Sequence, residues 1–199
     1  MKKSILLSVL IMGIIAGGKL LMNKNNVEPN MLRVAFPSAN TVDKYEPTGI
    51  QFDFEYIFLE NVFSPLVEMN KDGHVEPGVA EQIDWLGNEL KLTIRSSLKT
   101  ISGQKITTDD VVFSLKRLLV LSGNTHGNFK DIVCPGVDLK SVEDDCDGIR
   151  KDDEAVYIRA KGGTAFLLPM LSSIDFAIIP RSSVDPQTLK IINFKLKKK

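Results

Sequence analysis

The chain has 199 residues, of which 43% are hydrophobic and 25% charged, and its 25 Lys and Arg balance its 25 Asp and Glu. The composition is ordinary for a globular protein, and the length suits one large or two small domains. The zero net charge excludes the basic surplus typical of nucleic-acid binding and the acidic surplus typical of disorder.

The N-terminus has the pattern of an export signal. Lys2 and Lys3 precede an apolar stretch, Ile5 to Ala16, and small residues follow at Ala16-Gly17-Gly18, as signal cleavage requires. The apolar run also extends to Met22 with one interruption, which is close to the minimum length of a membrane helix. We therefore predict that residues 1–22 are a cleaved signal peptide or an uncleaved membrane anchor.

The next part of the chain predicts a linker, a strand and a helix. Residues 23–30 are polar and contain a proline, which is typical of a linker. Residues 31–36 alternate and are rich in apolar side chains, so we predict a strand. Residues 52–67 carry aromatic and aliphatic side chains at helical spacing, and this helix should end near Pro65.

Two hairpins are predicted after this helix. The turn Asn70-Lys71-Asp72-Gly73 separates the short apolar runs 66–69 and 74–75, and Asp-Gly is a strong hairpin signal. Residues 85–86 and 89–94 flank Gly87-Asn88 and form the second candidate. Between the two hairpins, residues 79–83 are compatible with a short helix.

The best helix signal is the run Thr107 to Leu121. A Thr N-cap, acids at Asp109 and Asp110 and apolar residues at helical spacing mark the start of a helix.

The rest of the chain gives weaker signals. Residues 122–135 look irregular, and residues 137–142 and 155–160 look like strands around an acidic loop. Residues 164–171 predict a short helix or turn, and residues 176–179 a last strand stopped by Pro180. The pattern as a whole predicts an α+β fold of antiparallel hairpins with packed helices.

Five separate blocks, in order, resemble the N-terminal part of the family 5 extracellular solute-binding proteins, which serve ABC importers of peptides and related solutes. The resemblance runs from about Met31 to about Asp185. Its blocks are Glu60-Asn-Val-Phe-Ser-Pro-Leu-Val67, Lys71-Asp-Gly73, Glu76-Pro-Gly-Val-Ala-Glu81, Leu90-Lys-Leu-Thr-Ile-Arg95 and Thr107-Thr-Asp-Asp-Val-Val-Phe-Ser-Leu-Lys-Arg117.

The resemblance implies a two-lobed periplasmic-binding-protein fold of type II, with mixed and antiparallel sheets and packed helices, that closes on a ligand at the lobe interface. The matched blocks belong to the first lobe, so residues 31–190 are expected to be a truncated solute-binding domain (lobe I). Residues 191–199 form a basic tail that looks like a frameshifted or prematurely ended reading frame.

The implied function is capture of peptides or related small solutes, as a monomer, for an ABC permease in the inner membrane. The implied location is periplasmic or extracytoplasmic, with tethering if residues 1–22 stay uncleaved. The alternative is a non-functional gene remnant, or a membrane-tethered single lobe that acts in protein interaction. No nucleic-acid partner is predicted.

The resemblance also suggests ligand contacts. Ser38, Asn40 and Thr41 follow the first predicted strand, where relatives place cleft residues, and their side chains can bond a peptide backbone. The alternative is a turn whose polar groups satisfy one another. Asn61 and Ser64, at the end of the predicted helix 52–67, are further ligand candidates. The nearby Phe63 and the later Trp85 are better explained as packing residues.

Cys134 and Cys146 are the two cysteines of the chain. An exported chain meets an oxidising compartment, so a disulfide between them is plausible, and two free buried thiols are the alternative. No CxxC pair supports redox catalysis or zinc binding.

No enzyme, metal or cofactor is predicted. Hydrolase, nucleotide and hydride-transfer motifs are absent, and His74 and His126 lack ligand partners at a suitable spacing. The acids Glu143, Asp145 and Asp147, followed by Gly148 and Glu154, echo a calcium loop. However, the flanking segments look like strands, whereas a calcium loop of this type lies between helices.

Overall fold

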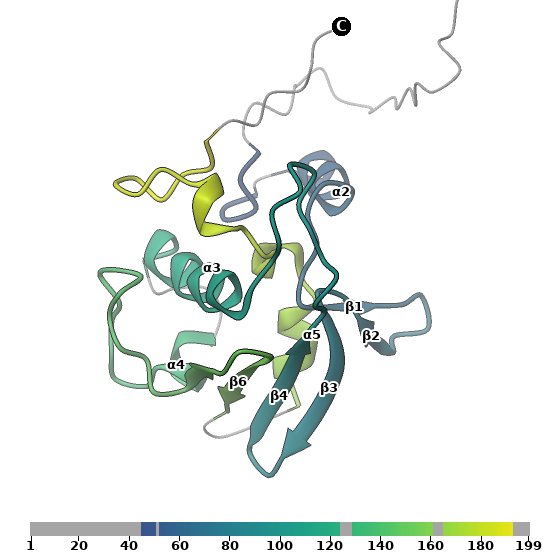
Figure 1. Ribbon diagram of the computed structural model, residues 1–199, viewed down its shortest axis with the longest axis vertical. Helices are drawn as coiled ribbons and strands as arrows, with labels where there is room; N and C mark the ends of the chain where they lie inside the picture. The colour runs from purple at the N-terminus through teal and green to yellow at the C-terminus, as the bar shows by residue number, and fades with distance from the viewer. Residues whose placement is uncertain (1–44, 51, 124–128, 161–164, 193–199) are drawn as a thin grey trace, which may run out of the picture. The chain divides into compact units, whose positions relative to one another are not determined.

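The computed structural model describes residues 45–50, 52–123, 129–160 and 165–192 (Figure 1). The predicted signal or anchor (1–22), the linker (23–30) and the strand at 31–36 lie outside the described residues. The described helices are α2 (Asp53–Glu60), α3 (Thr108–Leu121), α4 (Phe129–Val133) and α5 (Leu167–Leu171), with 3-10 turns η1 (Ile174–Phe176) and η2 (Arg181–Ser183). The described strands are β1 (Val67–Met69), β2 (Val75–Pro77), β3 (Ala80–Leu86), β4 (Glu89–Ile94), β5 (Ile149–Lys151) and β6 (Ala155–Arg159).

The centre of the described fold is a four-stranded antiparallel sheet in the order β3-β4-β6-β5. In β4, buried and half-buried residues alternate, so Leu90, Leu92 and Ile94 share one face. Helix α3 packs against β5 and β6, and α4 packs against β6. The sheet therefore buries its apolar face under helices, while its other face carries polar side chains.

Both predicted hairpins are present. Strands β1 and β2 pair around residues 70–74, where the Asn70 side chain accepts hydrogen bonds from the backbone N–H groups of Asp72 and His74, both at 3.0 Å. Strands β3 and β4 pair around Gly87-Asn88, with Leu86 opposite Glu89. Gly87 has a φ of 66°, which a residue without a Cβ adopts at little cost.

Helix α3 begins as predicted. The Thr107 hydroxyl accepts a hydrogen bond from the Asp110 N–H at 3.3 Å, and the Asp110 carboxylate accepts one from the Thr107 N–H at 3.0 Å. This reciprocal pair satisfies two backbone donors that a helix start would otherwise leave free.

Five predicted elements differ from the structure. The helix expected over residues 52–67, with its end near Pro65, ends at Glu60. Residues 79–83, considered compatible with a short helix, are not helical. Residues 80–83 belong to strand β3, because pairing with β4 outweighs weak local preference. Residues 137–142 form no strand; the Asp144 carboxylate accepts hydrogen bonds from the Lys140 and Ser141 N–H groups, which holds a loop instead.

The other two differences also result from contacts with other parts of the chain. The expected strand at 176–179 is absent, since the Ile178 N–H bonds the Ser64 carbonyl and the Ile179 N–H bonds the Ser114 hydroxyl. The stretch 122–135, expected to be irregular, contains the short helix α4, whose Phe129 and Val133 are buried.

The described residues bury two apolar clusters. The main core lies between the four-stranded sheet and helices α3, α4 and α5, and includes Leu92, Leu118 and Ile158. The second core joins α2 to the C-terminal part and contains Leu59, Phe113, Val142, Ile174, Ala177, Ile179 and Val184. Cys134 and Cys146, the two cysteines considered as a pair, are joined by a disulfide beside the main core.

A membrane could not be crossed by any helix in the described part of the chain, because none combines sufficient length with sufficient apolarity.

Candidate functional site

Two of the five predicted ligand residues are described. Asn61 and Ser64 lie just after α2 and are both exposed, whereas Ser38, Asn40 and Thr41 fall outside the described residues. The Asn61 side-chain amide donates a hydrogen bond to the Ile57 carbonyl at 2.8 Å, which fixes it at the end of the helix. The Ser64 backbone carbonyl accepts a hydrogen bond from the Ile178 N–H at 3.0 Å, and Ser64 itself is exposed.

The position of these two residues depends on the apolar residues beside them. Leu59 is buried in the second core, and Phe63 packs against the same cluster, which confirms the packing role expected for Phe63. Since Leu59 and Phe63 point inward, the adjacent Asn61 and Ser64 are left facing outward. Trp85, on the edge strand β3, is 38% exposed, which agrees with the half-buried packing role expected for it.

A buried polar group on α3 was missed by sequence analysis. Asp110, Ser114 and Arg117 are 6%, 5% and 2% exposed, and their spacing of four and three residues places them on one face of the helix. The Arg117 guanidinium forms an ion pair with Glu46 and donates to the Leu189 carbonyl at 2.7 Å. The available signal was the polar spacing itself, but charged residues on helices are usually solvent-exposed.

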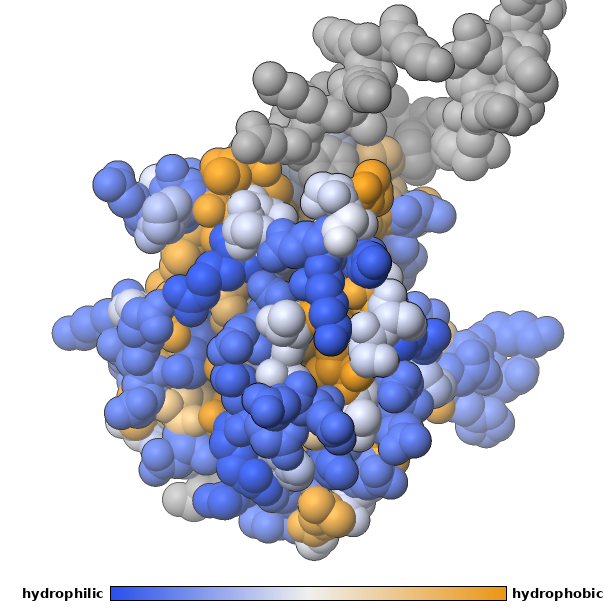
Figure 2. Space-filling model, viewed as in Figure 1, coloured by the Kyte–Doolittle hydropathy of each residue, from blue (hydrophilic) through white to orange (hydrophobic). Residues whose placement is uncertain are grey.

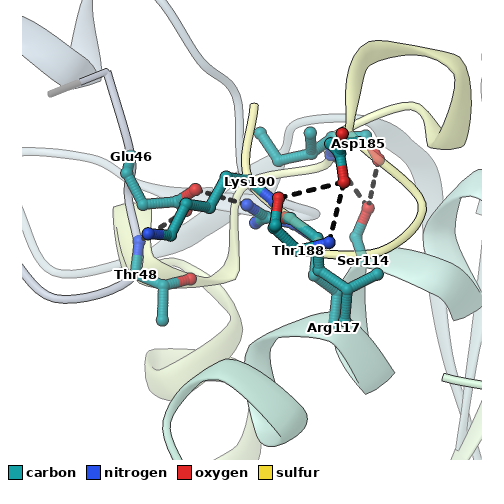
Figure 3. A network of polar contacts seen from close by, with 9 residues as sticks. Glu46, Thr48, Ser114, Arg117, Asp185, Thr188 and Lys190 are labelled. Carbon is teal, nitrogen blue, oxygen red and sulfur yellow. Dashed lines mark hydrogen bonds and ion pairs between the residues drawn. The ribbon is translucent and has the colours of Figure 1, made fainter. Parts of the chain in front are cut away.

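Figure 3 shows this region from close by, with Glu46 and Thr48 on one side, Asp185 and Ser114 on the other, and Lys190 and Thr188 between them. The Asp185 carboxylate accepts hydrogen bonds from the Gln187 and Thr188 N–H groups, at 2.9 and 2.8 Å. These bonds, Thr188 first, hold the pKa of Asp185 below its usual value.

A second polar cluster lies on the sheet. Arg150 on β5 bonds the Glu89 carboxylate on β4, and its guanidinium carbon lies 3.7 Å from the centre of the Tyr157 ring. The Tyr157 hydroxyl donates to Asp152 at 2.8 Å. The bond from Arg150 lowers the pKa of Glu89, and the bond to Asp152 raises the pKa of Tyr157. These side chains thus satisfy one another's hydrogen-bonding groups, which is typical of a network that stabilises structure.

The described residues contain no group of three or more His, Cys, Asp or Glu placed to hold a metal ion. Glu143, in the stretch that echoes a calcium loop, instead pairs with Arg181 at 2.7 Å.

Figure 2 shows a mainly hydrophilic face on which hydrophobic residues form separated patches. Among the described residues on that face, no large continuous apolar surface is visible.

The fold is thus an α+β arrangement with antiparallel sheets that matches part of a periplasmic binding protein. No protein-family model matches the chain, and no curated protein matches it in sequence.

Three solved structures illustrate the match. The murein tripeptide binding protein MppA of Escherichia coli is 22% identical, with a TM-score of 0.60 over 71% of this chain and 29% of MppA. OppA of Listeria monocytogenes, bound to peptide, is 18% identical, with a TM-score of 0.60 over 70% of this chain and 29% of OppA. The periplasmic oligopeptide-binding protein OppAIV of Borrelia burgdorferi is 18% identical, with a TM-score of 0.59 over 75% of this chain and 31% of OppAIV.

These neighbours are binding proteins, and the chain spans less than a third of their length. At such identities the likeness shows the fold alone, and fold alone does not define the ligand.

Proposed function

We propose that the chain supplies part of the first lobe of an exported substrate-binding protein that captures peptides or related small solutes for an ABC importer. The observation that carries the proposal is the fold: about 70% of the chain superposes on proteins described as binding peptides. The five sequence blocks that resemble the solute-binding family also support the proposal.

The proposed location is outside the cytoplasm, with the permease of the importer as the protein partner and the monomer as the working state. The export-type N-terminus supports this location. The Cys134–Cys146 disulfide supports it as well, because disulfides persist mainly in oxidising compartments.

The proposed ligand contacts are Ser38, Asn40 and Thr41 together with Asn61 and Ser64. Support comes from the exposure of Asn61 and Ser64 beside a helix end that the second core holds in place. Hydroxyl and amide groups can both donate to and accept from a peptide backbone, so this residue set suits an uncharged, extended ligand.

The test is thermal unfolding of the full chain with an equimolar library of tripeptides to pentapeptides. A ligand that binds the native state raises Tm at concentrations above its Kd. A shift with particular peptides supports the proposal. A cooperative transition that no peptide shifts contradicts it and favours the interaction role for a single lobe.

The site residues are tested with the double variant Asn61→Ala/Ser64→Ala. Two lost hydrogen bonds, each worth about 0.5–1.5 kcal/mol, should weaken peptide binding by about 5-fold to 150-fold. The matched control is Gln82→Ala, which removes an exposed amide from strand β3. Equal affinities in the double variant and the control would remove Asn61 and Ser64 from the site.

A further inference from the structure

The buried polar face of α3 binds the backbone of the C-terminal part of the chain at three points. The Asp110 carboxylate accepts a hydrogen bond from the Arg181 N–H at 3.1 Å. The Ser114 hydroxyl accepts from the Ile179 N–H at 2.8 Å and donates to the Asp110 carbonyl at 2.6 Å. Arg117 binds the Leu189 carbonyl, so one helix face satisfies backbone groups of three residues between positions 179 and 189.

Arg117 differs from the other two because it holds a second segment as well. Its ion pair with Glu46 reaches the N-terminal segment (residues 45–50), where the Glu46 carboxylate also accepts from the Thr48 N–H at 3.2 Å. The same segment contacts α2 through the Tyr45 and Phe58 rings, whose centres are 5.6 Å apart. One buried guanidinium therefore joins parts of the chain that lie about 70 residues to either side of it.

Hydrogen bonds within the C-terminal loop (residues 185–190) hold Leu189 where its carbonyl accepts from Arg117. Asp185 caps the loop from inside, and the Leu189 N–H bonds the Asp185 carbonyl at 2.8 Å. Leu189 has a φ of 55° and, among the described residues, no other non-glycine residue has a positive φ. A leucine persists in this conformation only when its surroundings hold it, and Arg117 is one of the groups that do so.

We propose that Arg117 is a positioning residue that couples the N-terminal segment to the C-terminal loop, so that a change of order in one changes the order of the other. The coupling deepens the proposed function, because the N-terminal segment directly follows the predicted ligand residues Ser38, Asn40 and Thr41. The proposed coupling itself rests only on the contacts of Arg117 with Glu46 and Leu189.

The physical basis is the burial of the charge. A buried guanidinium needs both a counter-ion and partners for its several N–H donors. When the Glu46 charge is lost, the guanidinium moves toward other acceptors or water, and its bond to the Leu189 carbonyl weakens. Lysine cannot replace arginine here, since a single ammonium lacks the planar fork that reaches two separate acceptors.

The test is amide hydrogen exchange of the full chain without any ligand, followed by mass spectrometry of peptides covering residues 45–50 and 184–192. Glu46→Gln should speed exchange in the C-terminal loop by at least about 5-fold, the lower end of typical coupling between sites. Arg117→Lys should speed exchange in both segments. The control Glu143→Gln removes an exposed ion pair to Arg181 and should change neither segment.

A reciprocal variant covers the case in which Glu46→Gln fails to fold. Asp185→Ala removes the cap of the C-terminal loop, and by reciprocity it should speed exchange in residues 45–50. The proposal is overturned if each variant loosens only the segment that it alters, or if Glu143→Gln loosens the C-terminal loop as much as Glu46→Gln does. Because no peptide is added, failure of peptide binding would count against the proposed function alone.

Discussion

At the scale of single residues, a close approach of two backbone segments restricts which residue can occupy position 148. A Cβ added at Gly148 would lie 2.0 Å from the Val133 carbonyl oxygen, beside the Cys134–Cys146 disulfide. A backbone atom cannot swing aside as a flexible side chain can, so only glycine fits where β5 begins. At position 73 an added Cβ would meet nothing within 4 Å. The φ of Gly73 is 79°, so only the backbone conformation disfavours a side chain there.

These two glycines give a matched pair of predictions. Gly148→Ala should lower the free energy of unfolding by about 3 kcal/mol, the upper end of the usual cost of overpacking, because the atom it meets belongs to the backbone. Gly73→Ala should cost only the left-handed backbone penalty, about 1–2 kcal/mol. Urea unfolding of both variants measures the difference, and equal losses would show that the approach at Gly148 relaxes easily.

At the scale of elements, the disulfide connects helix α4 to the loop that leads into β5. The bridge closes a loop with a sequence separation of 12. A loop of that length restricts the unfolded chain by about 3 kcal/mol in the chain-entropy model. The short helix α4, with five residues, has little stability of its own, so the bridge and the burial of Phe129 and Val133 must hold it.

Reduction should therefore lower the melting temperature by about 6–12 °C, since 1 kcal/mol corresponds to about 2–4 °C in a chain of this size. The measurement compares thermal unfolding with and without a thiol reductant. The control is Cys134→Ala/Cys146→Ala, which should melt at the same temperature in both conditions. A wild-type chain that is insensitive to reductant under conditions that demonstrably reduce the bridge would contradict the prediction.

At the scale of the whole molecule, several carboxyl groups make stability depend on pH. Hydrogen bonds lower the pKa of Glu89 (from Arg150), of Asp144 (from the Lys140 N–H), of Asp152 (from the Glu154 N–H) and of Asp185 (from the Thr188 N–H). A lowered pKa means that the folded chain binds protons less readily than the unfolded chain. The stability from these groups is therefore present above the ordinary carboxyl pKa and is lost as the pH falls through the lowered values.

We expect that these groups do not change the melting temperature between pH 7 and about pH 5. Below about pH 4 their protonation should lower the melting temperature. Asp185→Asn should melt at a lower temperature than wild type at pH 7 and should lose less on acidification. Thermal unfolding across this pH range measures both effects. A variant with the full acid dependence of the wild type would show that Asp185 does not contribute.

Features that depend on neighbouring residues could be predicted from the sequence alone. The Asn70–Gly73 and Gly87-Asn88 turns, the Thr107 cap and the start of α3 each need only a few adjacent side chains, and the structure confirms them. The α+β class followed from these signals, and of the proposed ligand residues the structure describes Asn61 and Ser64.

Features that depend on partners elsewhere in the chain became known only from the fold. Residues 80–83 extend strand β3 because β4 pairs with them, and residues 176–179 fail to form a strand because Ser64 and Ser114 bond the N–H groups of Ile178 and Ile179. Arg117 is buried because Glu46 and Leu189, each about 70 residues away, supply its counter-ion and acceptor. Burial and pairing are properties of two segments together, so no local pattern in either one contains them.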